Sequence, residues 1–235
     1  MKFFFVPIKA ALKPRRAPFR RAALVRFAAM LAVLALSATL VLAQTLGRAT
    51  ADFANLRANK TETPFGRLIA DSLQNATSSD VALINAGALR SGTLEAGDVS
   101  REDIEPLLSF GEDDVVRLTL AGAQIRAALE RAAGVFPTGS PAFLHCAGLS
   151  ATFDPAAPGG SRVVSVQIRG KNLDDQASYT VAMPVSLAEG AAGYFNIWSG
   201  AQQRPANVSL LGAVENHVRA RKEISPDFTP RFREK

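Results

Sequence analysis

A basic segment followed by an apolar run divides this chain before any fold can be considered. Residues 1–43 hold eight Lys and Arg residues and no acid, and they end in the apolar run Phe27–Ala43, FAAMLAVLALSATLVLA. Val41 and Ala43 stand at the −3 and −1 positions of a cleavage after Ala43, where a signal peptidase needs small side chains. The run has 17 residues, against about 20 for a helix that crosses a bilayer. We therefore expect a cleaved signal peptide, with an uncleaved N-terminal membrane anchor over residues 27–43 as the alternative.

The positive charge of the chain belongs to this N-terminal segment. The whole chain has a net charge of +6, but residues 44–235 carry 19 basic and 21 acidic residues and are therefore close to neutral. A nucleic-acid-binding body would show clustered Lys and Arg across the domain. We expect no nucleic-acid partner, and a membrane contact only through the N-terminal segment if it stays attached. Either interpretation puts the body outside the cytoplasm, as a periplasmic or secreted protein or as one anchored to the inner membrane.

The body must fold on its hydrophobic core. It holds a single cysteine, Cys146, so no intramolecular disulfide can form in it. Its length is sufficient for one sizeable domain. Residues 44–60 have no sustained period and predict a linker, which leaves residues 61–205 as the domain. Residues 206–235 predict a C-terminal helix, from about 209 to 221, and a tail.

Local patterns within the domain mix helices and strands. Thr63 is a good N-cap ahead of Pro64 at the first helical position, and apolar residues on one face then predict a helix to about Asn75. The further expected elements are strands over 81–84, 115–120, 149–153, 162–169 and 179–183, and helices over 100–108 and 121–133. This order predicts an α/β or α+β fold in layers rather than a doubly wound sheet.

The supply of reactive side chains argues against catalysis by this body alone. It has two histidines, His145 and His217, and neither lies in a metal-binding pattern, whereas a two-metal hydrolytic centre needs several His and Asp ligands. A packed, hydrogen-bonded position is the better interpretation of His145, and a solvated position that of His217. No nucleophile elbow, P-loop or dinucleotide-binding glycine pattern occurs. We expect no catalytic residue, no metal ligand and no cofactor in this chain.

What remains is a set of residues suited to a flat, anionic ligand. Asn85, Gly87 and Arg90 come from a loop that follows the first strand, where α/β folds bind ligands. Phe110 lies in a Ser-Phe-Gly break, and Tyr194 lies in a second glycine-rich loop. Two aromatic rings can sandwich a heterocycle, an Asn amide can read its edge, and an Arg can hold phosphate. From the residues alone an alternative stays open: both aromatics belong to the core, the Asn to a turn and the Arg to the surface.

Seven motifs in order and spacing give the chain a resemblance to a known family. They are E-T-P-F-G-R-L-I-A-D (62–71), D-V-A-L-I-N-A-G-A-L-R (80–90), E-A-G-D-V-S (95–100), S-F-G (109–111), L-A-G-A-Q-I-R-A-A-L-E (120–130), Y-T-V-A (179–182) and G-A-A-G-Y (190–194). Over about residues 57–200 the chain resembles the C-terminal domain of 5'-nucleotidases and UDP-sugar hydrolases. The resemblance implies a layered α/β/β/α sandwich that binds a nucleotide or nucleoside.

The resemblance also implies roles for individual residues. The positions that match the family's ligand contacts are the base-stacking pair Phe110 and Tyr194, the base contact Asn85, the close-approach glycine Gly87, and the phosphate-side arginines Arg90 and Arg67. In the family, catalysis belongs to a separate metallophosphoesterase domain with two divalent metals, which we expect this chain to lack. We therefore expect a nucleotide- or nucleoside-binding domain of nucleotide catabolism, which could complete a separately encoded metallophosphoesterase subunit.

Departures from the family pattern keep other hypotheses open. Ala192 stands where the family has an Asp, Glu112 stands where it has an Asn, and no arginine stands at Thr61. No acid lies between Tyr194 and Glu215 to bind ribose hydroxyls. One alternative is a degenerate structural or interaction domain without a ligand. The least favoured alternative is a self-sufficient 5'-nucleotidase.

Overall fold

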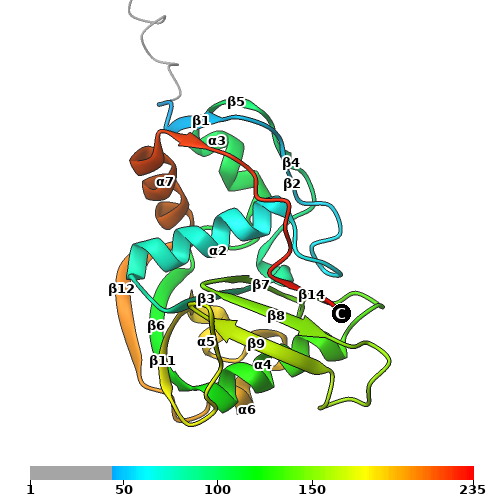
Figure 1. Cartoon of the computed structure of the whole chain (residues 1–235). Coiled ribbons are helices and arrows are strands. Elements are labelled where there is room, and N and C mark those ends of the chain that lie inside the picture. Colours follow the sequence, from blue (N-terminus) through cyan, green and yellow to red (C-terminus); the bar gives the residue numbers. More distant parts are fainter. Residues whose placement is uncertain (1–43) are drawn as a thin grey trace, which may run out of the picture. The chain divides into compact units, whose positions relative to one another are not determined.

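A five-stranded sheet organises residues 44–235, the part of the chain that the computed structural model describes (Figure 1). Its strands, in spatial order, are β12 (Gln203–Ser209), β6 (Asp114–Ala121), β11 (Ser178–Pro184), β3 (Val81–Asn85) and β7 (Leu144–Ala147). β11 runs parallel to β3, and the other neighbours are antiparallel. Every residue of β3 is buried, as its continuous apolar run predicts for a central strand. The signal peptide or anchor expected over residues 1–43 lies outside the described residues.

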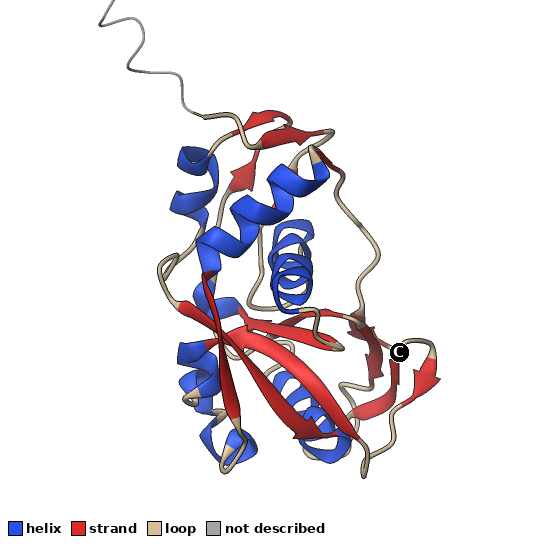
Figure 2. Ribbon diagram, turned by 90° about the vertical axis from the view of Figure 1, so that its left-hand side faces the viewer, coloured by secondary structure: helices blue, strands red, loops and turns tan. Residues whose placement is uncertain are grey.

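Helices cover both faces of this sheet. The helices are α2 (Pro64–Thr77), α3 (Arg101–Ile104), α4 (Gly122–Gly134), α5 (Val185–Ala188), α6 (Phe195–Trp198) and α7 (Leu210–Arg221). α2 and α7 pack together on one face, and α4, α5 and α6 lie on the other (Figures 1 and 2). Between residues 44 and 235, no helix is long and apolar enough to cross a membrane.

The start of α2 follows from its sequence. The Thr63 side chain accepts a hydrogen bond from the Gly66 amide at 3.0 Å, which caps the helix as predicted. Phe65, Ile69 and Leu73 then face the core and are fully buried. A Cβ on Gly66 would lie 2.1 Å from Nδ1 of the β7 histidine, so only glycine lets α2 approach β7 this closely.

A second sheet of four strands holds the C-terminus. Its order is β10 (Lys171–Asn172), β9 (Val163–Ile168), β8 (Leu149–Phe153) and β14 (Phe232–Glu234). β14 runs parallel to β8, and the Phe232 ring packs against Phe143 and Phe153 with centroids 5.6 and 4.9 Å away. Figure 1 shows the C-terminal segment, in red, running from α7 past the N-terminal end of α2 to β14. The predicted C-terminal helix is confirmed as α7, and the segment after it adds β13 and β14 to the sheets and buries the side chains of Ile224 and Phe232.

The linker predicted over residues 44–60 is wrong. Two small sheets involve this segment: β1 (Gly47–Ala49) pairs with β5 (Gly97–Val99) and β13 (Glu223–Ile224), and β2 (Phe53–Ala54) pairs with β4 (Thr93–Leu94). Leu46 and Phe53 are buried in the core. Within the described residues, the compact unit therefore extends over 44–235 rather than 61–205. Strands of two or three residues carry no periodic signal, and their partners lie far away in the sequence.

The mixed α/β class predicted from the sequence is confirmed. All eight elements predicted within the domain are present, although residues 100–108 divide into α3 and a 3₁₀ turn over Glu105–Leu107. β12 was not predicted, because it is mostly exposed and contains Pro205. Its amphipathic signal is therefore weak.

Candidate functional site

The end of β3 and the loop after it hold three of the predicted binding residues, of which Asn85 is buried, Gly87 half-buried and Arg90 exposed. The Asn85 side chain donates from Nδ2 to the Pro141 carbonyl at 3.1 Å, and the Gly87 amide donates to the same carbonyl at 3.0 Å. The Asn85 Oδ1 atom has no partner among residues 44–235. A Cβ on Gly87 would lie 3.0 Å from the Pro141 Cβ atom. Gly87 therefore packs closely against Asn85 and Pro141, and its close approach to a ligand stays a prediction.

Arg90 projects from a backbone that is held on both sides. Its amide donates to the Leu107 carbonyl at 2.9 Å, and its carbonyl accepts from Asn55 Nδ2 at 2.7 Å. Arg90 itself is exposed and makes no ion pair within the described part of the chain. A fixed backbone with a free guanidinium leaves this side chain available for an anionic ligand.

Phe110 lies on the loop next to Arg90. The two loops are joined by a β-bridge between Leu89 and Leu108 and by the hydrogen bond from the Ser109 amide to the Ala88 carbonyl, at 2.9 Å. The Phe110 residue is 60% exposed. An exposed ring on a held loop can stack on a flat ligand.

A hollow of about 440 Å³ lies between the two loops, and the residues on either side of Phe110 line it, although the Phe110 ring does not. The hollow is lined by Arg90, Pro106, Leu108, Ser109 and Gly111, and also by three acidic residues, Glu102, Glu105 and Glu112. Sequence reasoning singled out only Glu112 of these acids. Two of the three carboxylates, those of Glu105 and Glu112, accept from Arg101 at 3.4 and 2.8 Å, which offsets part of their charge.

Tyr194 lies in the core rather than on the surface. It is 0% exposed, its hydroxyl donates to the Ala142 carbonyl at 2.6 Å, and its ring stacks on Trp198 at 5.4 Å between centroids. Arg131 lies over the same ring at 5.3 Å and donates from Nε to the Ala192 carbonyl at 2.9 Å. Burial raises the pKa of the Tyr194 hydroxyl. The structure does not bring Tyr194 to face Phe110, and its stacking role stays a prediction that requires the ring to leave this packing.

The exposed aromatic of the second loop is Phe195, the next residue. From the sequence, the stacking role was predicted for its neighbour Tyr194. Consecutive residues of a helical turn project about 100° apart, so a Tyr-Phe pair at a helix start exposes one ring when it buries the other. The Tyr-Phe pair was therefore the sequence signal that one of the two rings is exposed. It could not decide which ring is buried.

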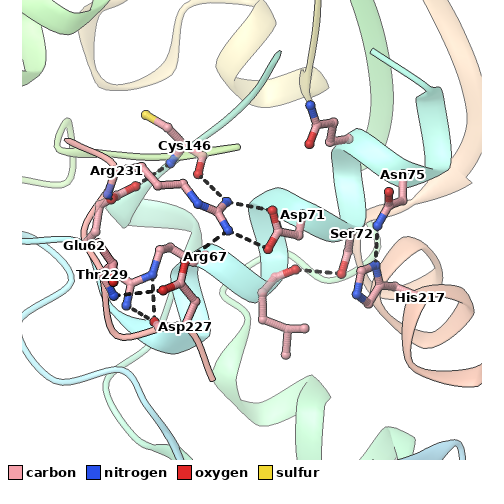
Figure 3. A network of polar contacts seen from close by, with 12 residues as sticks. Glu62, Arg67, Asp71, Ser72, Asn75, Cys146, His217, Asp227, Thr229 and Arg231 are labelled. Carbon is pink, nitrogen blue, oxygen red and sulfur yellow. Dashed lines mark hydrogen bonds and ion pairs between the residues drawn. The ribbon is translucent and has the colours of Figure 1, made fainter. Parts of the chain in front are cut away.

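Arg67, the second predicted phosphate ligand, is buried, unlike the exposed Arg90. It is 2% exposed, and its Nε and Nη2 atoms donate to the Asp227 carbonyl, the former at 2.9 Å (Figure 3). Burial lowers the pKa of its guanidinium, and the charges of Glu62 and Asp227 partly oppose that shift. The structure therefore separates Arg67 from Arg90 and places it in a network with the C-terminal segment.

The centre of that network is Glu62, which sequence reasoning did not single out. One carboxylate oxygen accepts from the Cys146 amide at 2.7 Å, and the other accepts from the amides of Arg231 and Phe232. Burial raises the pKa of Glu62, and these three amides oppose the shift. Arg231 in turn binds both oxygens of Asp71, at 2.6 and 2.9 Å (Figure 3). The cluster thus ties α2, β7 and the C-terminal segment together.

Neither histidine stands in a reactive arrangement. His145 is fully buried, accepts from the Thr63 amide at 3.3 Å and donates to the Ala58 carbonyl at 3.0 Å, and burial lowers its pKa to about 4. His217 is half-buried and lies 2.8 Å from Asn75 Nδ2, so it is in contact with solvent only on part of its ring. No group of three or more His, Cys, Asp or Glu side chains between residues 44 and 235 could hold a metal ion. The described residues therefore do not fit a two-metal centre.

These features define a mixed α/β domain that carries exposed aromatic and basic residues on its loops. The chain belongs to the family described as 5'-nucleotidase, C-terminal domain, whose profile matches residues 41–199. A 5'-nucleotidase-related protein of Glossina morsitans morsitans is 30% identical over 203 residues, covering 77% of this chain and 36% of that protein. A 5'-nucleotidase of Vibrio cholerae is 32% identical over 133 residues, covering 57% of this chain and 23% of that protein.

A solved structure shows the same fold. The 5'-nucleotidase precursor from Thermus thermophilus superimposes with a TM-score of 0.76 and 26% identity, over 92% of this chain and 43% of that protein. The chain spans less than half the length of each of these three relatives. The predicted family and the predicted domain within it are confirmed.

Proposed function

We propose that this domain binds a nucleoside or nucleotide at the hollow beside Phe110 and Arg90. The observation that carries the proposal is that an exposed aromatic ring and a free guanidinium lie on two neighbouring loops joined by backbone hydrogen bonds, with the hollow between them. A ring can stack on any base, and a guanidinium suits a phosphate. Membership of a family whose relatives are named 5'-nucleotidases supports the same ligand class.

Isothermal titration of the full chain with adenosine, AMP and UDP-glucose tests this proposal. We expect binding of at least one of them in the millimolar range or tighter. Arg90→Gln should weaken AMP roughly fivefold and leave adenosine within about twofold, because the guanidinium acts on the phosphate. Arg48→Gln, which changes another exposed arginine, is the matched control. If none of the three compounds binds at millimolar concentration, the proposal fails.

Catalysis, in this proposal, needs metal ligands from outside residues 44–235. A separate metallophosphoesterase that receives the nucleotide from this domain is the partner that best fits such an arrangement. The full chain alone should release no phosphate from AMP with added Mn²⁺ or Zn²⁺. Metal-dependent release that a chelator abolishes would instead assign hydrolysis to this chain.

Export by residues 1–43 is part of the same proposal, with the body in the periplasm or outside the cell, cleaved or anchored. Its support is the basic segment and the apolar run Phe27–Ala43. Cell fractionation with N-terminal sequencing of the recovered protein would test it. A body that starts at Gln44 supports a signal peptide, an uncut chain in the membrane fraction supports the anchor, and an uncut chain in the cytosol contradicts both.

A second candidate function is a structural or interaction domain that keeps the fold without a ligand. Two observations favour it: Tyr194 is buried in the core, and three glutamates line the hollow beside Phe110. Those carboxylates would repel a phosphate. In that case Phe110→Ala would change no ligand affinity, which the titration above measures directly.

A further inference from the structure

A groove of about 450 Å³ runs along α2 on the side that faces α7 and residues 221–227. Arg67 and Asp71 line it toward the start of α2, and Asn75 and His217 line it further along (Figure 3). Arg67 and Asn75 are separated by about 12 Å of helix, at 1.5 Å per residue. The volume lies within the ~300–1,000 Å³ that is usual for ligand sites. The lining differs from that of the hollow beside Phe110.

Two of the three acids that line this groove, Asp71 and Asp227, already have partners. Both oxygens of Asp71 accept from Arg231, at 2.6 and 2.9 Å. The Asp227 carboxylate accepts from the Thr229 amide at 2.8 Å and from Arg231 at 3.4 Å. Their charge is therefore compensated within the protein and leaves little attraction for a cationic ligand.

The donors of the groove, in contrast, lack partners. Arg67 Nη1 is buried and has none among residues 44–235. His217 Nδ1 accepts from the Asn75 amide, so in the neutral ring the proton sits on Nε2 and remains free to donate. Arg221 is exposed and makes no ion pair within the described part of the chain. Glu223 is also exposed. Of the acids that line the groove, it alone has no cationic partner within residues 44–235.

We propose that this groove binds a small oxyanion, the phosphate or carboxylate of a polar metabolite, through Arg221, His217 Nε2 and Arg67. Unpartnered donors beside compensated acids select for negative charge. Glu223 opposes the ligand from the rim and keeps the affinity modest. Burial and the nearby Arg221 charge lower the pKa of His217, while Asp71 opposes that shift, so the ring binds as a neutral donor at pH 7. The inference does not rest on the proposed nucleoside site.

Calorimetry on the full chain in a mild detergent tests this inference with three probes. Glycerol 3-phosphate and succinate present the two oxyanions, and glycerol is the uncharged control. We expect at least one oxyanion to bind in the millimolar range and glycerol not to bind. Whichever oxyanion binds more tightly identifies the preferred group.

Two arginine variants of α7 separate a built site from diffuse charge. Arg221→Gln should weaken the oxyanion at least fivefold, whereas Arg219→Gln should change it less than twofold. Both substitutions remove one positive charge from an exposed arginine, but Arg219 pairs with Glu215 away from the groove. Glu223→Gln should tighten binding about twofold, because it removes the opposing charge.

Two results would overturn the proposal of an oxyanion site in this groove. Binding of neither oxyanion at millimolar concentration overturns it, and so does an equal loss in the two arginine variants. The ¹⁵N chemical shifts of the His217 ring supply a second readout and should move on addition of the oxyanion. Phe110→Ala should leave this response intact, so failure of the nucleoside site and failure of the groove are distinguishable.

Discussion

The loops around Phe110 and the cluster around Glu62 use charge in opposite ways. At the loops, Arg90 is exposed on a fixed backbone, and its guanidinium has no acidic partner within the described residues. In the cluster, Glu62 is buried, and its two oxygens are bound by three backbone amides. The Arg90 guanidinium is therefore free to bind a ligand, whereas the hydrogen bonds of the Glu62 carboxylate stabilise the fold.

This difference explains why two arginines with the same predicted role separate. Arg67 and Arg90 were both expected to hold phosphate, but Arg67 is bound to the Asp227 carbonyl and is almost fully buried. Substitutions in the cluster should therefore change the free energy of unfolding. Substitutions at the loops should change ligand affinity and leave the free energy of unfolding nearly constant.

Loss of the Glu62 carboxylate is expected to have the largest effect. Glu62→Ala leaves three backbone N–H groups without an acceptor. Two of them are buried, each costing about 1–3 kcal/mol. We expect the free energy of unfolding to fall by about 3 kcal/mol or more in urea titrations. Hydrogen exchange should show the C-terminal segment opening first, since two of the three amides belong to it. Glu95→Ala, at an exposed position, should change stability by less than about 0.5 kcal/mol, and an equal loss there would contradict the comparison.

Acidification should act through His145, which lies beside the cluster. Its folded pKa of about 4 is below the ordinary histidine value of 6.5, so the unfolded chain binds more protons between these values. The free energy of unfolding should therefore fall as pH falls from 6.5 toward 4, by about 2 kcal/mol between pH 7.5 and pH 5.

The His145→Gln variant separates the contribution of His145 to the pH dependence of stability from the opposite contribution of Glu62. The raised pKa of Glu62 makes the folded state take up a proton over an overlapping range, which stabilises it as pH falls. The difference in slope between wild type and His145→Gln removes that common contribution. Equal slopes in urea titrations at pH 7.5, 6 and 5 would show that His145 does not stay neutral in the fold.

At the loops, Phe110→Ala should weaken nucleoside binding without unfolding the protein. One stacked base is worth about 1–3 kcal/mol, and the buried Tyr194 leaves a single face, so a loss near 1 kcal/mol, about fivefold, is expected. Phe228→Ala removes an equally exposed ring elsewhere and is the matched control. Calorimetry with adenosine measures both. Parallel losses in the two variants would mean that the nucleoside recognises no particular ring.

Much of the fold could be predicted because its signals are local. Thr63 and Pro64 mark the start of α2, and the apolar run of β3 marks a central strand. The pairing of β1 with β13 and of β14 with β8 could not be predicted, since each joins segments more than 70 residues apart and includes a C-terminal strand of two or three residues. Such pairings depend on tertiary packing, which leaves no period in the sequence.

For the candidate site, the sequence predicted the positions of the loops but not the directions of their side chains. The loops of Asn85 and Phe110 lie where the pattern placed them, but side-chain direction depends on distant contacts. Pro141 takes the Asn85 amide, and Arg131 binds the Ala192 carbonyl, where the backbone has a φ of 56°. That left-handed turn helps to direct Tyr194 inward, and no local pattern around G-A-A-G-Y specifies it.

The smallest effect is expected for Tyr194. This residue belongs to the binding loop in the sequence, but its side chain lies in the core. Tyr194→Phe removes only the hydroxyl that donates to the Ala142 carbonyl, so the free energy of unfolding should fall by about 1 kcal/mol. Adenosine affinity should stay within about twofold of wild type, since the ring remains buried. Tyr179→Phe, at the other tyrosine, whose hydroxyl accepts from the Asp174 amide at 3.2 Å on the surface, should change neither quantity measurably. Tighter adenosine binding in Tyr194→Phe would show that release of this ring is part of binding, and Tyr194 would then belong to the loop region in function as well as in sequence.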